Sequence, residues 1–176
     1  MRSLTTAAKV HRLLAELGRA ARGPGRVYLT GGTSAVLIGW RQSTIDVDLK
    51  LDPEPTGIFE AIARLKRELD INIELASPDD FMPALPGWQD RSPSIVRHGA
   101  VSFFHYDFHA QALAKIERGH TQDLADVHAM LARDLVTRDR LRQLFKQIEH
   151  LLIRYPAIDP VGLARRLDQF LGHTDG

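Results

Sequence analysis

The chain of 176 residues contains no cysteine, no long apolar run and almost no net charge. Without cysteine, disulfides and thiolate-bound metals are excluded. No segment approaches the roughly 20 consecutive apolar residues that a helix needs to cross a bilayer. Lys9 and Arg12 interrupt the first apolar positions, which argues against a signal peptide. A formal charge of +1 carries no overall signature of nucleic-acid binding. These absences predict a cytoplasmic protein without membrane contact.

Apolar residues recur at helical or strand spacing along most of the chain, and this periodicity predicts a mixed fold. We expect an α/β (α+β) fold in which a small mixed β-sheet with flanking helices occupies residues 1–108. A helical C-terminal part, residues 109–176, is expected to pack on this core. Expected helices cover Thr5–Ala21, Thr33–Gly39, Ile58–Leu69, Ala110–Arg118, Gln122–Leu131, Arg138–Arg154 and Val161–Leu171. Expected strands cover Arg26–Leu29, Thr44–Lys50, Ile71–Ala76, Ser94–His98 and Val101–Phe108, with an irregular loop over Ser77–Pro93.

A glycine pair, Gly31-Gly32, follows the apolar strand Val27–Leu29 and precedes a helix start. Glycine lets a backbone approach a ligand closely, and the first N–H groups of a helix point toward an anion. The hydroxyls of Thr33 and Ser34 are placed to add hydrogen bonds. This turn therefore predicts contact with phosphate.

Two aspartates one residue apart, Asp46 and Asp48, alternate with Ile45, Val47 and Leu49. On a strand, such residues project from the same face, roughly 7 Å apart along the backbone. Two parallel carboxylates are costly unless a positive group lies between them, and Mg²⁺ prefers hard oxygen ligands. The pair predicts a divalent cation together with a phosphate-bearing substrate, although an Asp-x-Asp alone is also common on solvated strand faces.

A third carboxylate is expected to join this pair. Glu74 lies on a later strand, and its side chain projects from the face opposite to that of Ile73 and Leu75. If the two strands pair, Glu74 would join Asp46 and Asp48 on one face. Asp107 competes for the role, although its strand face is less clearly polar. Both alternatives stay open at this stage, as does a plain solvated role for Glu74.

These residues resemble the DNA-polymerase-β-like nucleotidyltransferase superfamily, whose pattern joins a Gly-Gly turn to an apolar-flanked Asp-x-Asp and a later third acid. The run Leu113–Arg118, followed by Asp123–Val127, is similar to a second motif of the abortive-infection branch, which contains toxins of toxin–antitoxin systems. Arg41, before Asp46, also suits that branch. The resemblance extends from Val27 to Leu131. It implies a nucleotidyltransferase core in which the lysine of the second motif contacts nucleotide phosphates.

The resemblance implies transfer of a nucleoside monophosphate from a nucleoside triphosphate (NTP) to an acceptor hydroxyl, with Mg²⁺ or Mn²⁺ as cofactor. The acceptor would be RNA such as tRNA, or protein, and an antitoxin protein is a possible partner. A silent binding module and a small-molecule, antibiotic-type transferase are the alternatives, and the oligomeric state stays open. The expected catalytic residues are Asp46, Asp48, Glu74 and Lys115, of which the three acids would bind metal. The expected nucleotide-binding residues are Gly31, Gly32, Thr33, Ser34, Arg41, Lys115 and Asp123.

Overall fold

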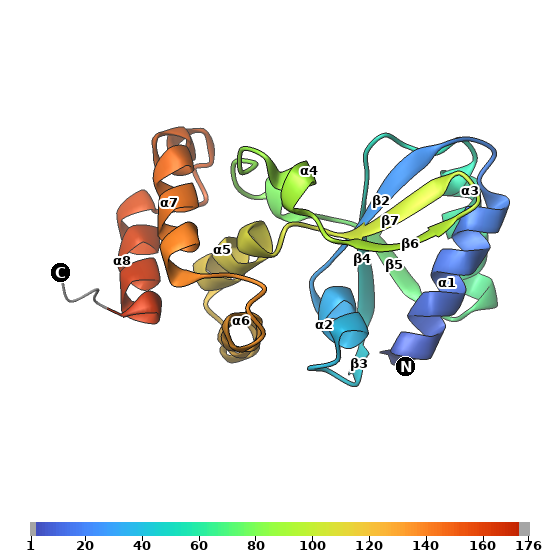
Figure 1. The fold of residues 1–176 in the computed structure, drawn as a ribbon, viewed down its shortest axis with the longest axis horizontal. Coiled ribbons are helices and arrows are strands. Elements are labelled where there is room, and N and C mark those ends of the chain that lie inside the picture. The colour runs from blue at the N-terminus through green and yellow to red at the C-terminus, as the bar shows by residue number, and fades with distance from the viewer. Residues whose placement is uncertain (1–2, 173–176) are drawn as a thin grey trace. The chain divides into compact units, whose positions relative to one another are not determined.

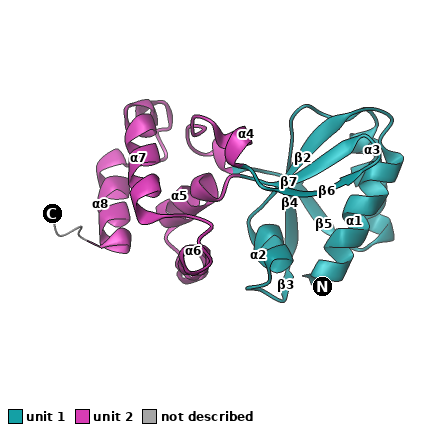
Figure 2. Ribbon diagram, in the orientation of Figure 1, with its two compact units in different colours: residues 1–77, 92–106 teal, residues 78–91, 107–176 magenta. Residues whose placement is uncertain are grey.

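A computed structural model describes residues 3–172 and shows the mixed α/β fold and helical C-terminal part that the sequence predicts (Figure 1). The chain forms two compact units (Figure 2). Unit 1 comprises residues 1–77 and 92–106, and unit 2 comprises residues 78–91 and 107–176. The segment 78–91, expected to be an irregular loop, is therefore part of the helical unit. It contains the 3₁₀ turn η1 (Pro78–Asp80) and the short helix α4 (Trp88–Arg91).

Unit 1 is built on a mixed five-stranded sheet in the order β5-β4-β2-β7-β6. β2 pairs antiparallel with β4 and parallel with β7, whereas β4 pairs parallel with β5. A further small sheet joins β1 to β3, two segments too short to show a strand period. The strands are β1 (Thr5–Thr6), β2 (Gly25–Thr30), β3 (Ser43–Thr44), β4 (Asp46–Leu51), β5 (Asn72–Leu75), β6 (Ser94–His98) and β7 (Val101–His105).

The helices α1 (Ala7–Ala20) and α3 (Ile58–Glu68) supply apolar residues to the same core as one face of the sheet. Val47 and Leu49 of β4 are buried in this core, as their alternation with the two aspartates predicts. Ile45 was expected on the same face but is 50% exposed, because it lies between β3 and β4 rather than within a strand. The helix α2 (Gly32–Ile38) follows β2 directly.

Unit 2 is helical. Two boundaries differ from the expected ones by three residues or more, the end of β7 just before this unit and the end of α7 within it. The expected strand Val101–Phe108 stops at His105, because Asp107 caps the next helix by accepting a hydrogen bond from the backbone N–H of His109 (3.1 Å). The expected helix Arg138–Arg154 changes to 3₁₀ geometry after Ile148, ahead of Pro156, which disfavours helical geometry at the preceding residue. The elements are α5 (Phe108–Arg118), α6 (Thr121–Ala132), α7 (Arg138–Ile148), η2 (Glu149–Arg154) and α8 (Pro160–Leu171).

Membrane insertion finds no support in the helices. Within the described residues, none combines the length and the apolar character that crossing a bilayer requires.

Candidate functional site

Asp46, Asp48 and Glu74 share one face of the sheet in unit 1. In the parallel pairing of β4 with β5, Asp48 lies directly opposite Glu74, and Asp46 lies opposite Asn72. The intervening Val47 is buried in the core on the other face. Both aspartates are half-buried, and Glu74 is exposed. The strand pairing on which a three-acid cluster depends is therefore present.

Asn72 is a member of this face that the sequence analysis assigned no role. Its side-chain Nδ2 donates hydrogen bonds to Asp46 Oδ1 and to Glu74 Oε1, the latter at 3.1 Å. One amide thereby connects two carboxylates that would otherwise only repel each other. The signal was available in the sequence, because Asn72 precedes Glu74 by two residues and so shares its strand face.

The glycine turn lies directly beside Asp48. Gly31 has a φ of 64°, and a Cβ at this position would stand 3.1 Å from Asp48 Oδ2. A side chain at Gly32 would collide with Thr44, whose Oγ1 donates a hydrogen bond to the backbone oxygen of Asp46 (3.1 Å). Only glycine combines the left-handed conformation with this close approach. The turn thus lies against the Asp48 carboxylate.

Arg41 reaches the same turn from the segment before β3. Its Nη1 atom lies 3.1 Å from the place that a Cβ of Gly32 would occupy. The absence of a side chain at Gly32 makes room for the Thr44 hydroxyl and for this guanidinium. Arg41 therefore brings positive charge to the glycine turn.

Thr33 and Ser34 are fully buried rather than open to solvent. The Ser34 hydroxyl donates to the backbone oxygen of Leu29 (3.2 Å) and meets Nδ1 of His105 at 3.0 Å. Since the single hydroxyl proton is used toward Leu29, the assignment makes His105 Nδ1 the donor to Ser34. Burial lowers the pKa of His105 to about 4, so the ring is neutral at physiological pH. This network braces the strand and helix on both sides of the glycine turn.

Lys115 and Asp123 belong to unit 2, where they form a separate charged cluster. The Lys115 ammonium lies 2.8 Å from Asp126 Oδ2 and 3.8 Å from Asp123 Oδ1, and all three side chains are buried. Gln122 donates to the second oxygen of Asp126 (3.1 Å), and Arg118 lies 3.4 Å from Asp123. The closer partner of the lysine is thus Asp126, one helical turn beyond the expected Asp123.

Asp107, the competing third carboxylate, also belongs to unit 2. It is fully buried and accepts hydrogen bonds from Nε and Nη2 of Arg91 at 3.0 and 2.8 Å. Burial by itself raises the pKa of Asp107, but hydrogen bonds from His109 and Arg91 and the charge of Arg91 outweigh it, so the net pKa lies below the usual value. These contacts occupy Asp107 within its own unit, whereas Glu74 pairs with the aspartate strand.

The acid face offers carboxylate oxygens, the type of donor that a divalent cation such as Mg²⁺ prefers. Within residues 3–172, no group of three acidic or histidine side chains stands ready to enclose a metal ion by itself. Mg²⁺, however, is commonly held by one or two carboxylates, with water and substrate phosphates completing its shell. Asp46 and Asp48 provide two such ligands beside the glycine turn, so the donor set fits Mg²⁺ in company with a phosphate ligand.

Residues 9–156 match the model of a protein family described as nucleotidyltransferase of unknown function (DUF6036). The match covers most of both units, and the chain therefore belongs to this family. No similar protein of curated function and no similar solved structure was found.

Proposed function

From membership of a nucleotidyltransferase family, we propose that this chain transfers a nucleoside monophosphate from an NTP to an acceptor hydroxyl, with Mg²⁺ or Mn²⁺ as cofactor. The observation that supports the proposal most directly is the surface shared by Gly31, Asp48 and Glu74. There, a backbone open to a ligand lies against carboxylates on paired strands. We also propose that the chain is a member of the DNA-polymerase-β-like nucleotidyltransferase superfamily, which its motifs resemble.

In this proposal, Asp46 and Asp48 hold the metal, and Gly31, Gly32 and Arg41 contact the triphosphate. A bound Mg²⁺ would offset the negative charge of the phosphates and polarise the α-phosphorus. The acceptor oxygen attacks that phosphorus, the bond to the bridging oxygen breaks, and pyrophosphate leaves with the electron pair.

The acceptor hydroxyl loses a proton in this step. Glu74 is exposed and lies opposite Asp48, so its carboxylate is placed to accept that proton. Thr33 and Ser34, which were expected to contact the phosphates, are both buried and are therefore not proposed to do so. They support the turn from within the fold, and Ser34 does so through Leu29 and His105.

One observation favours a second candidate, a binding module without transfer activity. The resemblance assigns Lys115 to phosphate contact and Asp123 to the nucleotide site, but the Lys115 ammonium is neutralised by Asp126 at 2.8 Å. A lysine in this state is paired within unit 2 and offers no free charge to a ligand. The pairing of β4 with β5 supports the proposed acid site, whereas the buried pair of Lys115 with Asp126 does not support a phosphate contact by this lysine.

The abortive-infection resemblance extends the proposal to a toxin-like role with an antitoxin protein as partner. RNA such as tRNA, protein and small molecules are then the acceptor classes to be separated by experiment. A cytoplasmic location is part of the same proposal. The base of the nucleotide is to be identified by the same experiments.

A label-transfer assay tests the proposal. The protein is incubated with each α-labelled NTP, Mg²⁺ or Mn²⁺, and total cellular RNA. The control is the double variant Asp46→Asn/Asp48→Asn, which keeps the shape of both side chains. A second control, Glu68→Gln, removes an exposed acid that pairs with Arg64 on α3 (2.9 Å). We expect label on an acceptor with the wild type and Glu68→Gln, and none with the double variant.

The same variants separate a transferase from a binding module. A ligand that binds only the folded state raises the melting temperature. If Mg²⁺ with an NTP raises it in the wild type but no label is transferred to RNA, protein or small-molecule acceptors, the binding module is the correct reading. If the double variant transfers label as well as the wild type, the proposed site is wrong.

A further inference from the structure

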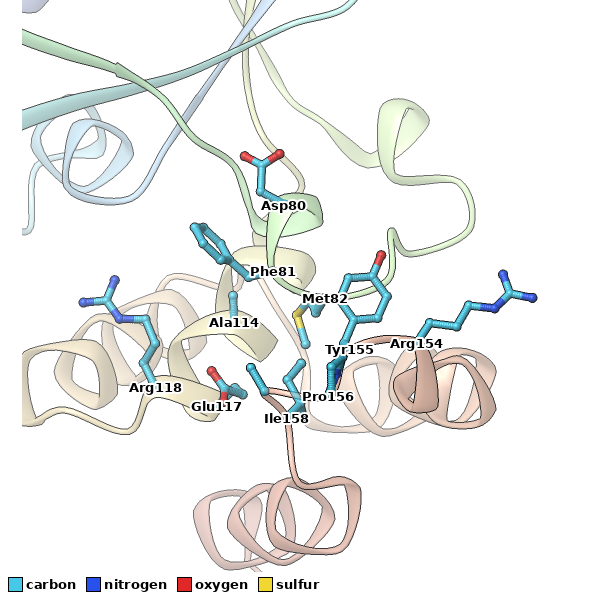
Figure 3. A pocket seen from close by; sticks show the side chains of 11 residues that line it. Asp80, Phe81, Met82, Ala114, Glu117, Arg118, Arg154, Tyr155, Pro156 and Ile158 are labelled. Atoms are coloured by element: carbon cyan, nitrogen blue, oxygen red, sulfur yellow. The ribbon is translucent and has the colours of Figure 1, made fainter.

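Unit 2 contains a cavity of about 600 Å³ with mostly apolar walls (Figure 3). Pockets of this volume hold a small molecule or one flat group of a larger ligand. Met82 and Ile158 are buried and line the cavity, and Ala114 adds a small side chain from α5. A mostly apolar recess is therefore available within the helical unit.

Two aromatic rings border the cavity. Phe81 is 66% exposed although the adjacent Met82 is only 3% exposed. Figure 3 shows the rings of Phe81 and Tyr155 on either side of Met82. Phe81 is thus an exposed ring and Tyr155 a half-buried one, and aromatic rings beside an apolar cavity are the surface on which unpaired nucleic-acid bases stack, since every base offers a flat π-face.

Charged groups surround these rings in an order that suits a polynucleotide. Arg118 comes from the end of α5 and Arg154 from the end of η2, and the two guanidinium groups lie toward opposite sides of the cavity in Figure 3. A cation, an aromatic cavity and a second cation match the phosphate, base and phosphate of a single strand. The carboxylate of Asp80 points away from Met82 in the same view.

Glu117 supplies the one acidic group of α5 that lines the cavity. A carboxylate accepts hydrogen bonds but donates none, so it favours a base that carries an exocyclic amino group. Cytosine, adenine and guanine have such a group, whereas the one donor on the pairing edge of uracil, N3–H, lies between two carbonyl oxygens that a carboxylate repels. The lining thus contains a feature that distinguishes among bases.

We propose that this cavity binds an unpaired, amino-bearing base of single-stranded nucleic acid. The base stacks on Phe81 and Tyr155 and donates to Glu117, while Arg118 and Arg154 contact the flanking phosphates. The inference also names single-stranded nucleic acid as the acceptor class of the transferase. This last point rests on the proposed function, whereas the base site itself does not.

Fluorescence anisotropy with a short labelled oligocytidylate, without NTP or divalent cation, tests the site. Loss of one stacking ring in Phe81→Ala should weaken binding roughly tenfold. Arg154→Gln should weaken binding and reduce the slope of log affinity against log salt concentration by about 0.7. Phe59→Ala, at a ring 48% exposed on α3, and Arg140→Gln, at a half-buried position of α7, should leave binding unchanged.

Base preference gives a second readout that general damage to the fold would not produce. Oligouridylate should bind roughly tenfold more weakly than oligocytidylate, because uracil lacks the amino group and its N3–H is flanked by two carbonyl oxygens that the Glu117 carboxylate repels. Glu117→Leu should remove this difference while keeping the aromatic contacts. Ribose and deoxyribose versions of the probe then show whether RNA or DNA is the ligand.

The proposal is overturned if the wild-type protein does not bind the probe, or if Phe81→Ala and Arg154→Gln bind as the wild type does. Equal binding of the cytosine and uracil probes overturns the assignment of Glu117. Asp46→Asn/Asp48→Asn should bind the probe normally while losing nucleotidyl transfer. Binding without transfer in the wild type would thus refute the proposed function and leave the base site standing.

Discussion

Glu74→Gln is expected to make the metal-free protein more stable while it lowers nucleotidyl transfer. In the structure, Glu74 lies directly opposite Asp48 on the neighbouring strand and accepts a hydrogen bond from Asn72 at 3.1 Å. Glutamine keeps an oxygen that accepts this bond but removes one of two facing negative charges. The change therefore isolates the electrostatic cost of the acid face.

The size of the gain follows from the strand pairing. Like charges directly opposite on neighbouring strands destabilise a sheet by roughly 0.2–1 kcal/mol. Because Glu74 is exposed, we take the middle of this range, about 0.5 kcal/mol, which raises the melting temperature by about 1–2 °C in a chain of this size. The gain should shrink as added salt screens the two charges.

Calorimetric melting in EDTA and then in Mg²⁺ measures the effect. An ion present at about 100 times its dissociation constant stabilises the folded state by about 2.7 kcal/mol. Mg²⁺ should raise the melting temperature of the wild type more than that of Glu74→Gln, so the order of the two proteins reverses.

Glu68→Gln is the matched control, since it breaks an exposed ion pair with Arg64 worth at most about 0.5 kcal/mol. This variant should be slightly less stable than the wild type, with or without Mg²⁺. If Glu74→Gln is destabilised in EDTA as Glu68→Gln is, the acid face is not a repulsive cluster and the reasoning fails.

Three further changes test the buried charges and the histidine. Lys115→Met should lower the free energy of unfolding in urea by about 3–5 kcal/mol, because it leaves Asp126 buried without its lysine. Arg91→Met should cost about 3 kcal/mol by the same reasoning at Asp107, measured in the same way. His105 is neutral when folded, with its pKa lowered from 6.5 to about 4, so the unfolded state binds more protons between these values. The contribution of His105 to the free energy of unfolding is therefore fully present above pH 6.5 and is lost as the pH decreases from 6.5 to about 4. The loss is at most about 1.4 kcal/mol per pH unit. His105→Asn should flatten this slope.

Each of these expectations can fail separately. A Lys115→Met protein as stable as the wild type would show that Asp126 does not depend on the lysine. An unchanged urea midpoint in Arg91→Met would contradict a stabilising role for the two hydrogen bonds from Arg91 to Asp107 Oδ2. A pH slope that persists in His105→Asn would assign the titration to other groups. Asp107 affects stability at lower pH than His105 does, because the pKa of Asp107 is depressed in the folded state. The stability that Asp107 adds is lost as the pH decreases below 3.8, the usual pKa of an aspartate, and through the folded pKa.

The face of the sheet that carries Asp46 and Asp48 was predictable because strand alternation depends only on residue spacing. Once Val47 and Leu49 are buried, their neighbours must point the other way. The pairing of Asp48 with Glu74 was a weaker inference, because spacing does not specify which strands are adjacent. The two-residue strands β1 and β3 show no period, and the sequence carries no local signal for them.

Contacts between residues far apart in the chain explain most of what pattern reasoning missed. Ser34 was expected to contact phosphate, and its contact with His105, 71 positions away, is set by the packing of α2 against the end of β7. Lys115 and Asp126 lie on successive helices, and their distance depends on how α5 and α6 pack. Asp107 followed a strand-like run, and only its role as a helix cap removes it from that strand.

Burial and pairing separate the two kinds of charged group in this chain. In unit 2, Lys115 and Asp126 form a close, buried pair, and such a pair costs stability when one member is removed. In unit 1, Asp48 and Glu74 lie on adjacent strands with the same sign of charge, an arrangement that gains from a cation. Loss of activity in a Lys115 variant therefore reports on folding unless its stability is measured as well. Loss of activity in Glu74→Gln, with stability unchanged or raised, reports on the site itself.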